Sequence, residues 1–176
     1  MAQVFQAQHR RLLQEAAGIA EGVTSDFFKL GESHWRRARY DILTLEGLRA
    51  EEISPHALAL VAKYDGRPQD RLLKSAAFDF YRVCLQDHNI LKALNACGDL
   101  RLLPLLIYIL THELVHIVRF SQFLALFEAS PEQKQQEEQH VHRLTQKILT
   151  PLKYLELPLV MRYYEDWQGG LQHADL

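Results

Sequence analysis

The sequence predicts an all-α protein, a single-domain bundle of about six to seven helices. Apolar residues recur at helical spacing along its 176 residues, and helix start and stop signals separate these stretches. We find no alternation of apolar and polar residues with the period of two that indicates a half-buried strand. The length fits one domain with a sizeable core. We expect this domain to span residues 1–176, with a frayed tail over 168–176.

The composition is that of an ordinary soluble globular protein. Hydrophobic residues make up 48% and charged residues 24%, and the net charge of −2 gives no reason to expect nucleic-acid binding. Residues 1–11 carry arginines where a signal peptide needs an apolar run, and the longest apolar stretch, 102–110, is far shorter than a membrane span. The cysteines, Cys84 and Cys97, fit no metal or redox spacing. We therefore expect a cytoplasmic protein without nucleic-acid or membrane partners.

The first half of the chain is predicted to form three helices. The first runs from about Gln3 to Gly22, and the second begins at Ser33, a suitable N-cap. The third begins at Ser54-Pro55, with serine as N-cap and proline at the first helical position. It ends at Gly66, where glycine can adopt the left-handed conformation of a helix end.

The second half is predicted to continue in the same way. One long helix covers about 69–95, and the next runs from about Asp99 to Phe127. Ser130 is then an N-cap, followed by proline and by the glutamine of a capping box, so a helix should run from there to about Thr150. A shorter, interrupted helical stretch lies between Pro151 and Trp167.

The motif that points to chemistry is His112-Glu113-Leu114-Val115-His116, within the helix that begins near Asp99. Residues four apart stack on one helix face, so His112 and His116 present two imidazoles to one point. Two such imidazoles can bind Zn²⁺, and the neighbouring Glu113 can deprotonate a water molecule there. Because uncompensated polar groups are costly in so apolar a stretch, we predict a zinc site.

The following helix offers a third ligand, either Glu137 or Glu138. A zinc site needs at least one further protein ligand. Val141 marks the core face of this helix, and the two glutamates lie about 40° and about 60° to either side of it. The short connection predicts an antiparallel hairpin, so the site should lie between two consecutive antiparallel helices.

The run from Ile109 to Val118 resembles the extended signature of zinc metallopeptidases. A glutamate on the next helix, about 20 residues later, is similar to the gluzincin branch of that family. The resemblance implies Glu138 as third ligand, with Glu137 as the alternative. It implies Glu113 as the general base, which takes a proton from the attacking water and passes it to the leaving amine. The substrate would be a peptide or protein.

Three further features are typical of that family. An acid one turn after the third ligand often orients a ligating histidine, but here His142 occupies that position, which is a departure from the pattern. A side chain that stabilises the oxyanion is also expected, and Tyr154, Tyr163 and Tyr164 follow the third-ligand helix. Metallopeptidases hold their substrate against the edge of a β-sheet. The absence of a predicted sheet is the chief objection to a peptidase.

Two other interpretations remain open. Glu113-x-x-His116 and Glu137-x-x-His140 both have the spacing of di-iron carboxylate bundles, in which iron replaces zinc and Glu113 is a ligand. Such a bundle needs two further glutamates, for which the candidates are Glu15, Glu21 and Glu46. The other interpretation is a non-catalytic interaction or regulatory protein whose metal is structural. The sequence gives no oligomeric state.

Overall fold

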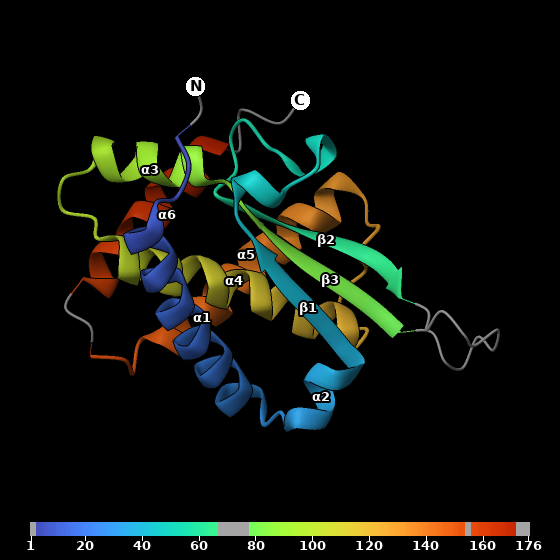
Figure 1. Cartoon of the computed structure of the whole chain (residues 1–176). Coiled ribbons are helices and arrows are strands. Elements are labelled where there is room, and N and C mark those ends of the chain that lie inside the picture. Colours follow the sequence, from blue (N-terminus) through green and yellow to red (C-terminus); the bar gives the residue numbers. More distant parts are fainter. Residues whose placement is uncertain (1–2, 67–77, 154–155, 172–176) are drawn as a thin grey trace.

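The computed structural model describes residues 3–66, 78–153 and 156–171, and it shows a mixed α/β fold. The prediction of an all-α bundle is therefore wrong. A three-stranded sheet and six α-helices are described (Figure 1). In chain order these are α1 (Ala7–Phe28), α2 (Glu32–Arg37), β1 (Ala38–Leu43), β2 (Ala59–Gly66), β3 (Phe78–Leu85), α3 (Asp87–Ala96), α4 (Leu102–Ser121), α5 (Pro131–Leu149) and α6 (Leu157–Leu171), with two 3-10 turns, η1 (Leu45–Gly47) and η2 (Ala50–Glu52).

Helix α4 is the central element of this fold. It contacts all three strands as well as α1, α5 and α6, and every residue from Pro104 to Val118 is buried. The helix has the length and mean hydropathy, 1.5, of a membrane span, although 89% of that window is buried inside the protein. The uninterrupted apolar run 102–110 is only part of this helix and is too short to span a membrane by itself. A core helix meets the same criteria, so this is weak evidence for a membrane span.

The sheet has the order β1-β3-β2, with β3 in the centre. Strand β1 pairs with β3 in parallel, and β2 pairs with β3 antiparallel. Alternate residues of β3 are fully buried, namely Tyr81, Val83 and Leu85. This places the core face of the sheet against the helices.

The all-α prediction first fails in the helix that was predicted to begin at Ser33. Helix α2 ends at Arg37, and residues 38–43 form β1 instead. An alternation of polar and apolar residues does exist there, but six residues are too few to separate a strand from a helix by pattern. The strand is stabilised by distant partners, such as the cross-strand ion pair of Asp41 with Arg82.

The Ser54-Pro55 signal marks a turn rather than a helix start. The Ser54 hydroxyl accepts hydrogen bonds from the backbone N–H groups of His56 (3.3 Å) and Ala57 (3.0 Å). A serine side chain bonds in this way in turns as well as in helix caps. The chain then enters β2, which ends at the Gly66 that was predicted to end a helix.

The predicted long helix over 69–95 is in fact two elements, β3 and α3, and its first part lies outside the described residues. Helix α1 continues past Gly22 to Phe28, and the residue that follows, Lys29, has a left-handed φ of 56°. The start of α5 is confirmed: the Ser130 hydroxyl accepts from the Gln133 N–H at 3.2 Å, and the Gln133 side chain accepts from the Ser130 N–H at 3.1 Å. Helix α6 extends to Leu171, into the predicted tail.

Candidate metal centre

Helices α4 and α5 form an antiparallel hairpin, and the side chains that meet between them show its register. Tyr108 contacts His142, His112 contacts Glu138, and further along α4 Arg119 contacts Glu137. This is the arrangement that the short connection predicts. It brings the histidine face of α4 against the N-terminal half of α5.

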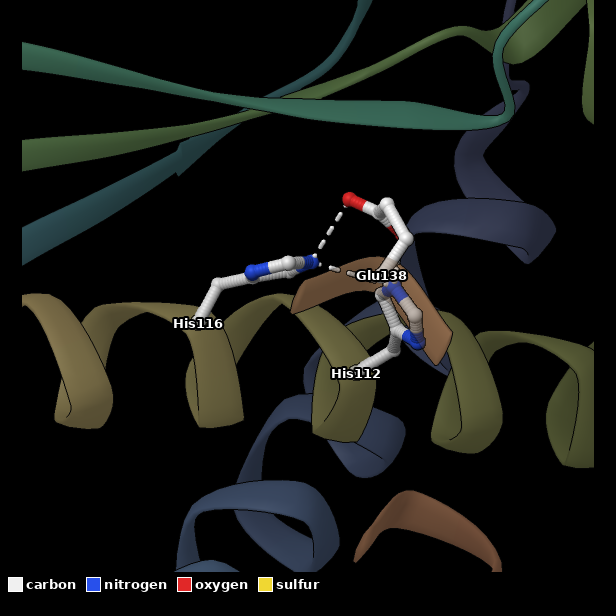
Figure 2. A group of neighbouring side chains, drawn as sticks. All are labelled: His112, His116 and Glu138. Carbon is white, nitrogen blue, oxygen red and sulfur yellow. Dashed lines mark hydrogen bonds and ion pairs between the residues drawn. The ribbon is translucent and has the colours of Figure 1, made fainter. Parts of the chain in front are cut away.

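Three of the predicted site residues, His112, His116 and Glu138, lie together, and we call them the metal cluster. Their ligand atoms all lie within 4.8 Å of one another. Figure 2 shows the two imidazoles and the carboxylate converging on one point. The Nε2 atoms of His112 and His116 are 3.1 Å and 2.9 Å from the two oxygens of Glu138. The two Nε2 atoms are 3.2 Å apart.

This geometry fits a divalent metal ion. Ligand atoms about 2.0–2.1 Å from tetrahedral Zn²⁺ lie roughly 3.3 Å apart, close to the separations in the metal cluster. When two imidazole nitrogens face each other, only one of them can donate a proton to the other in a hydrogen bond. A metal cation, in contrast, can accept the lone pairs of both nitrogens. His112 and His116 are 4% and 6% exposed, while the Glu138 side chain is 52% exposed. A metal held here would therefore have both a buried side and a side open to solvent.

The outer ring nitrogens of the histidines depart from the usual metal-site pattern. The Nδ1 atoms of His112 and His116 are buried and have no hydrogen-bond partner among the described residues. A ligating histidine normally donates its other N–H to a carboxylate, a carbonyl or water.

Burial acts to raise the pKa of Glu138, but its hydrogen bonds with His112 and His116 outweigh burial and hold the pKa well below its usual range.

Glu113, the predicted general base, lies beside the cluster and not in it. It is 8% exposed, and among the described residues it has no hydrogen-bond partner. Burial raises the pKa of its carboxyl to about 7, the nearby His112 acts to lower it, and Glu138 acts to raise it. A charged carboxylate is costly to bury in a core helix, which is the cause of the raised pKa.

Glu137, the alternative third ligand, is placed elsewhere by the structure. It forms a two-point ion pair with Arg119, in which Arg119 Nη2 is 3.1 Å from Glu137 Oε2. Both side chains are largely buried, at 14% and 18% exposed. Of the two adjacent glutamates, only Glu138 reaches the histidines.

His142 and Tyr164 lie next to the metal cluster. His142 is hydrogen-bonded through Nδ1 to the Tyr108 hydroxyl and contacts no ligand atom of the cluster. The Tyr164 ring lies 6.2 Å from the His112 ring and 4.1 Å from that of Tyr108. Tyr164 is thus the tyrosine that the fold brings to the site; Tyr154 lies outside the described residues. Helical pattern alone could not select it, because α6 folds back from a distant part of the chain.

The carboxylates required for a di-iron site are not gathered here. Glu21 bonds the Tyr40 hydroxyl, Glu46 bonds Arg10, and Glu15 is exposed. Glu137 is occupied by Arg119, and His140 is outside the cluster. The described geometry therefore gives one three-ligand site rather than a pair of metal sites.

The sheet that the sequence interpretation missed lies next to the cluster. Strand β2 is an edge strand and, of the three strands, contacts α4 most extensively. In Figure 2 the three side chains project from the helices toward the sheet. None of the β2 residues from Ala59 to Tyr64 is buried. The site thus has a strand edge beside it.

Comparisons with protein-family models, curated proteins and solved structures found no match to this chain.

Proposed function

We propose that this protein is a zinc-dependent peptidase in which His112, His116 and Glu138 hold the metal. The observation that carries the proposal is the convergence of these three side chains beside the β2 edge, with the unpartnered Glu113 on the same helix. Structural zinc sites have four protein ligands, whereas catalytic sites have three and an open position. Glu138, half exposed, lies on the side from which a substrate can enter.

The edge strand removes the main objection to a peptidase. An extended peptide can add to β2 by backbone hydrogen bonds, since β2 pairs only with β3 in the described sheet. A zinc ion in the cluster would polarise the scissile carbonyl and activate water. Glu113 then accepts the proton of the attacking water and delivers it to the leaving amine. Tyr164, buried beside His112, is the candidate to donate a hydrogen bond to the oxyanion.

Iron is the second candidate metal, because two histidines and one carboxylate can also bind Fe²⁺. The neighbouring Glu113 favours hydrolysis, for which an unpaired base is required. Metal analysis of the purified protein distinguishes the two, with about one zinc per chain expected. The partners of this protein would be peptide or protein substrates. We also propose that it acts in the cytoplasm and binds neither nucleic acid nor a membrane.

The test of this function is the Glu113→Gln variant. We expect it to retain zinc and to lose about a thousandfold in peptide cleavage, within the 10²–10⁴ range of general acid–base catalysis. Zinc content and cleavage of a denatured-protein digest are measured together. The matched control is His140→Ala on α5, outside the metal cluster, which should retain both zinc and cleavage. Loss of zinc from Glu113→Gln, or full activity in it, contradicts the proposal.

A further inference from the structure

The loop between α4 and α5 carries the most exposed large apolar side chains of the described structure. Phe123, Leu124 and Leu126 are 88%, 55% and 66% exposed, and we call these three residues the apolar loop. Phe123 has a φ of 56°, a left-handed conformation that an aromatic residue rarely adopts. Apolar patches that face solvent commonly mark interaction sites.

The backbone of the apolar loop is hydrogen-bonded to the C-terminal end of α4. Leu124 donates its backbone N–H to the Arg119 carbonyl at 2.9 Å, and Phe123 donates to the Phe120 carbonyl at 3.2 Å. The Arg119 side chain, fixed by its ion pair with Glu137, also donates to the Leu124 carbonyl at 3.4 Å. The glutamate that does not reach the metal cluster therefore helps to fix the exposed loop.

Aromatic rings extend from the metal cluster to Phe127, the residue that follows the apolar loop in the sequence. The Phe120 ring stacks on the His116 ring at 5.7 Å, and the Phe127 ring packs on Phe120 at 5.3 Å. His112, His116 and Phe120 are four residues apart, so they occupy one face of α4. The apolar loop thus continues the surface on which the metal cluster lies.

The direction of the elements determines which part of a substrate would meet the apolar loop. Figure 1 shows β2 and α4 running the same way, from the side of α3 toward the side of α2. A peptide paired antiparallel with β2, the more stable pairing, runs opposite to α4. Its residues N-terminal to the scissile bond therefore lie toward the C-terminal end of α4, where the apolar loop is.

We infer that the apolar loop contacts large apolar side chains of the substrate, about three residues N-terminal to the bond that is cleaved. This inference rests on the proposed peptidase function. The five residues from His116 to the end of α4 at Ser121 correspond to about 8 Å at helical rise. The apolar loop begins two residues further on, so it lies about three residues of an extended peptide from the cluster. The substrate class is therefore peptides rich in leucine, phenylalanine or similar residues on that side.

The charges around the loop favour a peptide over a lipid surface. Between Arg119 and Lys134 the chain carries Glu128 and Glu132 and no basic residue, and Arg119 is neutralised by Glu137. Binding to an anionic membrane surface requires basic residues beside the apolar ones. The charged residues between Arg119 and Lys134, which follow the apolar loop, are acidic instead.

The test variant combines Phe123→Asn, Leu124→Gln and Leu126→Gln in the full chain. Asparagine tolerates the left-handed conformation, and all three side chains are exposed, so the fold should be retained. The matched control is Ile53→Gln, which removes an apolar side chain that is 43% exposed and lines a hollow beside α3. Circular dichroism and zinc content verify both proteins.

The first measurement is the sequence profile of bonds cleaved in a denatured-protein digest, read by mass spectrometry. Wild type and Ile53→Gln should cleave after segments enriched in large apolar residues about two to four positions before the bond. The triple variant should lose this enrichment. Its kcat/KM should fall about tenfold for an apolar peptide, the lower range for loss of an apolar contact, and about twofold or less when serines replace those positions.

The second measurement is binding without cleavage. In a zinc-loaded Glu113→Gln background, fluorescence anisotropy with a fluorescein-labelled apolar peptide should show a Kd about tenfold higher for the triple variant. Cleavage by wild type with an unchanged profile and Kd in the triple variant overturns this inference and leaves the peptidase proposal standing. If wild type cleaves nothing in the digest and the peptide does not bind, both fail.

Two other occupants of the apolar loop are tested in parallel. Flotation with phosphatidylserine-containing vesicles tests a membrane surface, and light scattering tests a second copy of this chain. If the triple substitution changes only flotation or only the molar mass, the inference about substrate is wrong.

Discussion

Two polar clusters inside this protein differ in how completely their hydrogen bonds are satisfied. The first, the sheet cluster of Asp41, Glu52 and Arg82, is fully paired. Arg82 donates to Asp41 at 3.0 Å through both Nε and Nη2, and to Glu52 at 3.2 Å through Nη1. Glu52, 3% exposed, also accepts from the Arg49 N–H at 2.9 Å and from the Tyr64 hydroxyl. Every charge there has a partner of opposite sign or a donor.

The metal cluster is the opposite case. Its two Nε2 atoms face each other, and among the described residues both Nδ1 atoms are buried without a hydrogen-bond partner. The buried carboxyl of Glu113 lies beside the cluster. A satisfied polar cluster stabilises the fold, whereas an unsatisfied one is retained at a cost to stability and indicates a function. Substitutions in the sheet cluster should therefore change stability, and substitutions in the metal cluster should change ligand binding.

The largest expected effect is the loss of metal binding in His116→Ala. Zinc at a thousandfold excess over its Kd should stabilise the wild-type protein by about 4 kcal/mol, and the variant should lose nearly all of this. Thermal denaturation with zinc and with a chelator measures the difference. His140→Ala, on α5 outside the cluster, is the control and should respond to zinc as wild type does. If zinc stabilised His116→Ala as much as the wild-type protein, His112, His116 and Glu138 would not be the zinc site.

Arg82→Ala should destabilise the protein by about 2–3 kcal/mol and leave zinc affinity unchanged. It leaves the buried Glu52 with its hydrogen bonds from Arg49 and Tyr64 but without a counter-charge, and breaking a buried ion pair costs ~3–5 kcal/mol. We expect the low end because the Asp41 side chain is 33% exposed. Urea denaturation of the chelator-treated protein measures the change in stability, and zinc titration of the folded protein measures the zinc affinity. A large fall in zinc affinity would show that the two clusters are coupled.

Substitutions of the two adjacent glutamates of α5 should have different effects on zinc affinity. Glu138→Gln should weaken zinc binding by about 10–100-fold, or ~1.4–2.7 kcal/mol, since a charged ligand is replaced by a neutral one. Glu137→Gln should keep zinc affinity and lose some stability, because Arg119 is left with no counter-charge. Competition titration with a zinc chelator gives both values. The reverse order would identify Glu137 as the ligand.

The smallest expected effect is the pH dependence of the sheet cluster. Burial acts to raise the pKa of Glu52, but hydrogen bonds from Arg49, Tyr64 and Arg82 outweigh it, so the pKa is lowered from its ordinary value of 4.5. The stability this contributes is present above pH 4.5 and is lost as pH falls through the lower folded-state pKa. Urea denaturation from pH 6 to pH 3 should show a shallower decline in Glu52→Gln. An unchanged slope would rule out Glu52 as a source of the acid sensitivity.

The hairpin of α4 and α5 could be predicted from the sequence because its determinants are local. The capping box at Ser130, the apolar run of α4 and the four-residue spacing of His112 and His116 all act within one element or between neighbours. The choice between Glu137 and Glu138 depends on Arg119, which forms an ion pair with Glu137 and lies 18 residues before it in the chain.

The sheet could not be predicted because its determinants are distant in sequence. Strand β1 is held by the pairing of Asp41 with Arg82, 41 residues away, and six residues show too little alternation to identify it. Ser54 caps a turn with the same hydroxyl geometry that caps a helix. Tyr164 reaches the site only because α6 packs back onto α4.

The closeness of the metal ligands along the chain has a consequence for folding kinetics. His112 and Glu138 are separated by 26 residues, whereas the β1–β3 contact of Asp41 with Arg82 spans 41 and links strands that are not consecutive. Short-range contacts close faster than long-range strand pairing. We therefore expect the helical hairpin to be able to capture its metal before strand β1 has paired with β3.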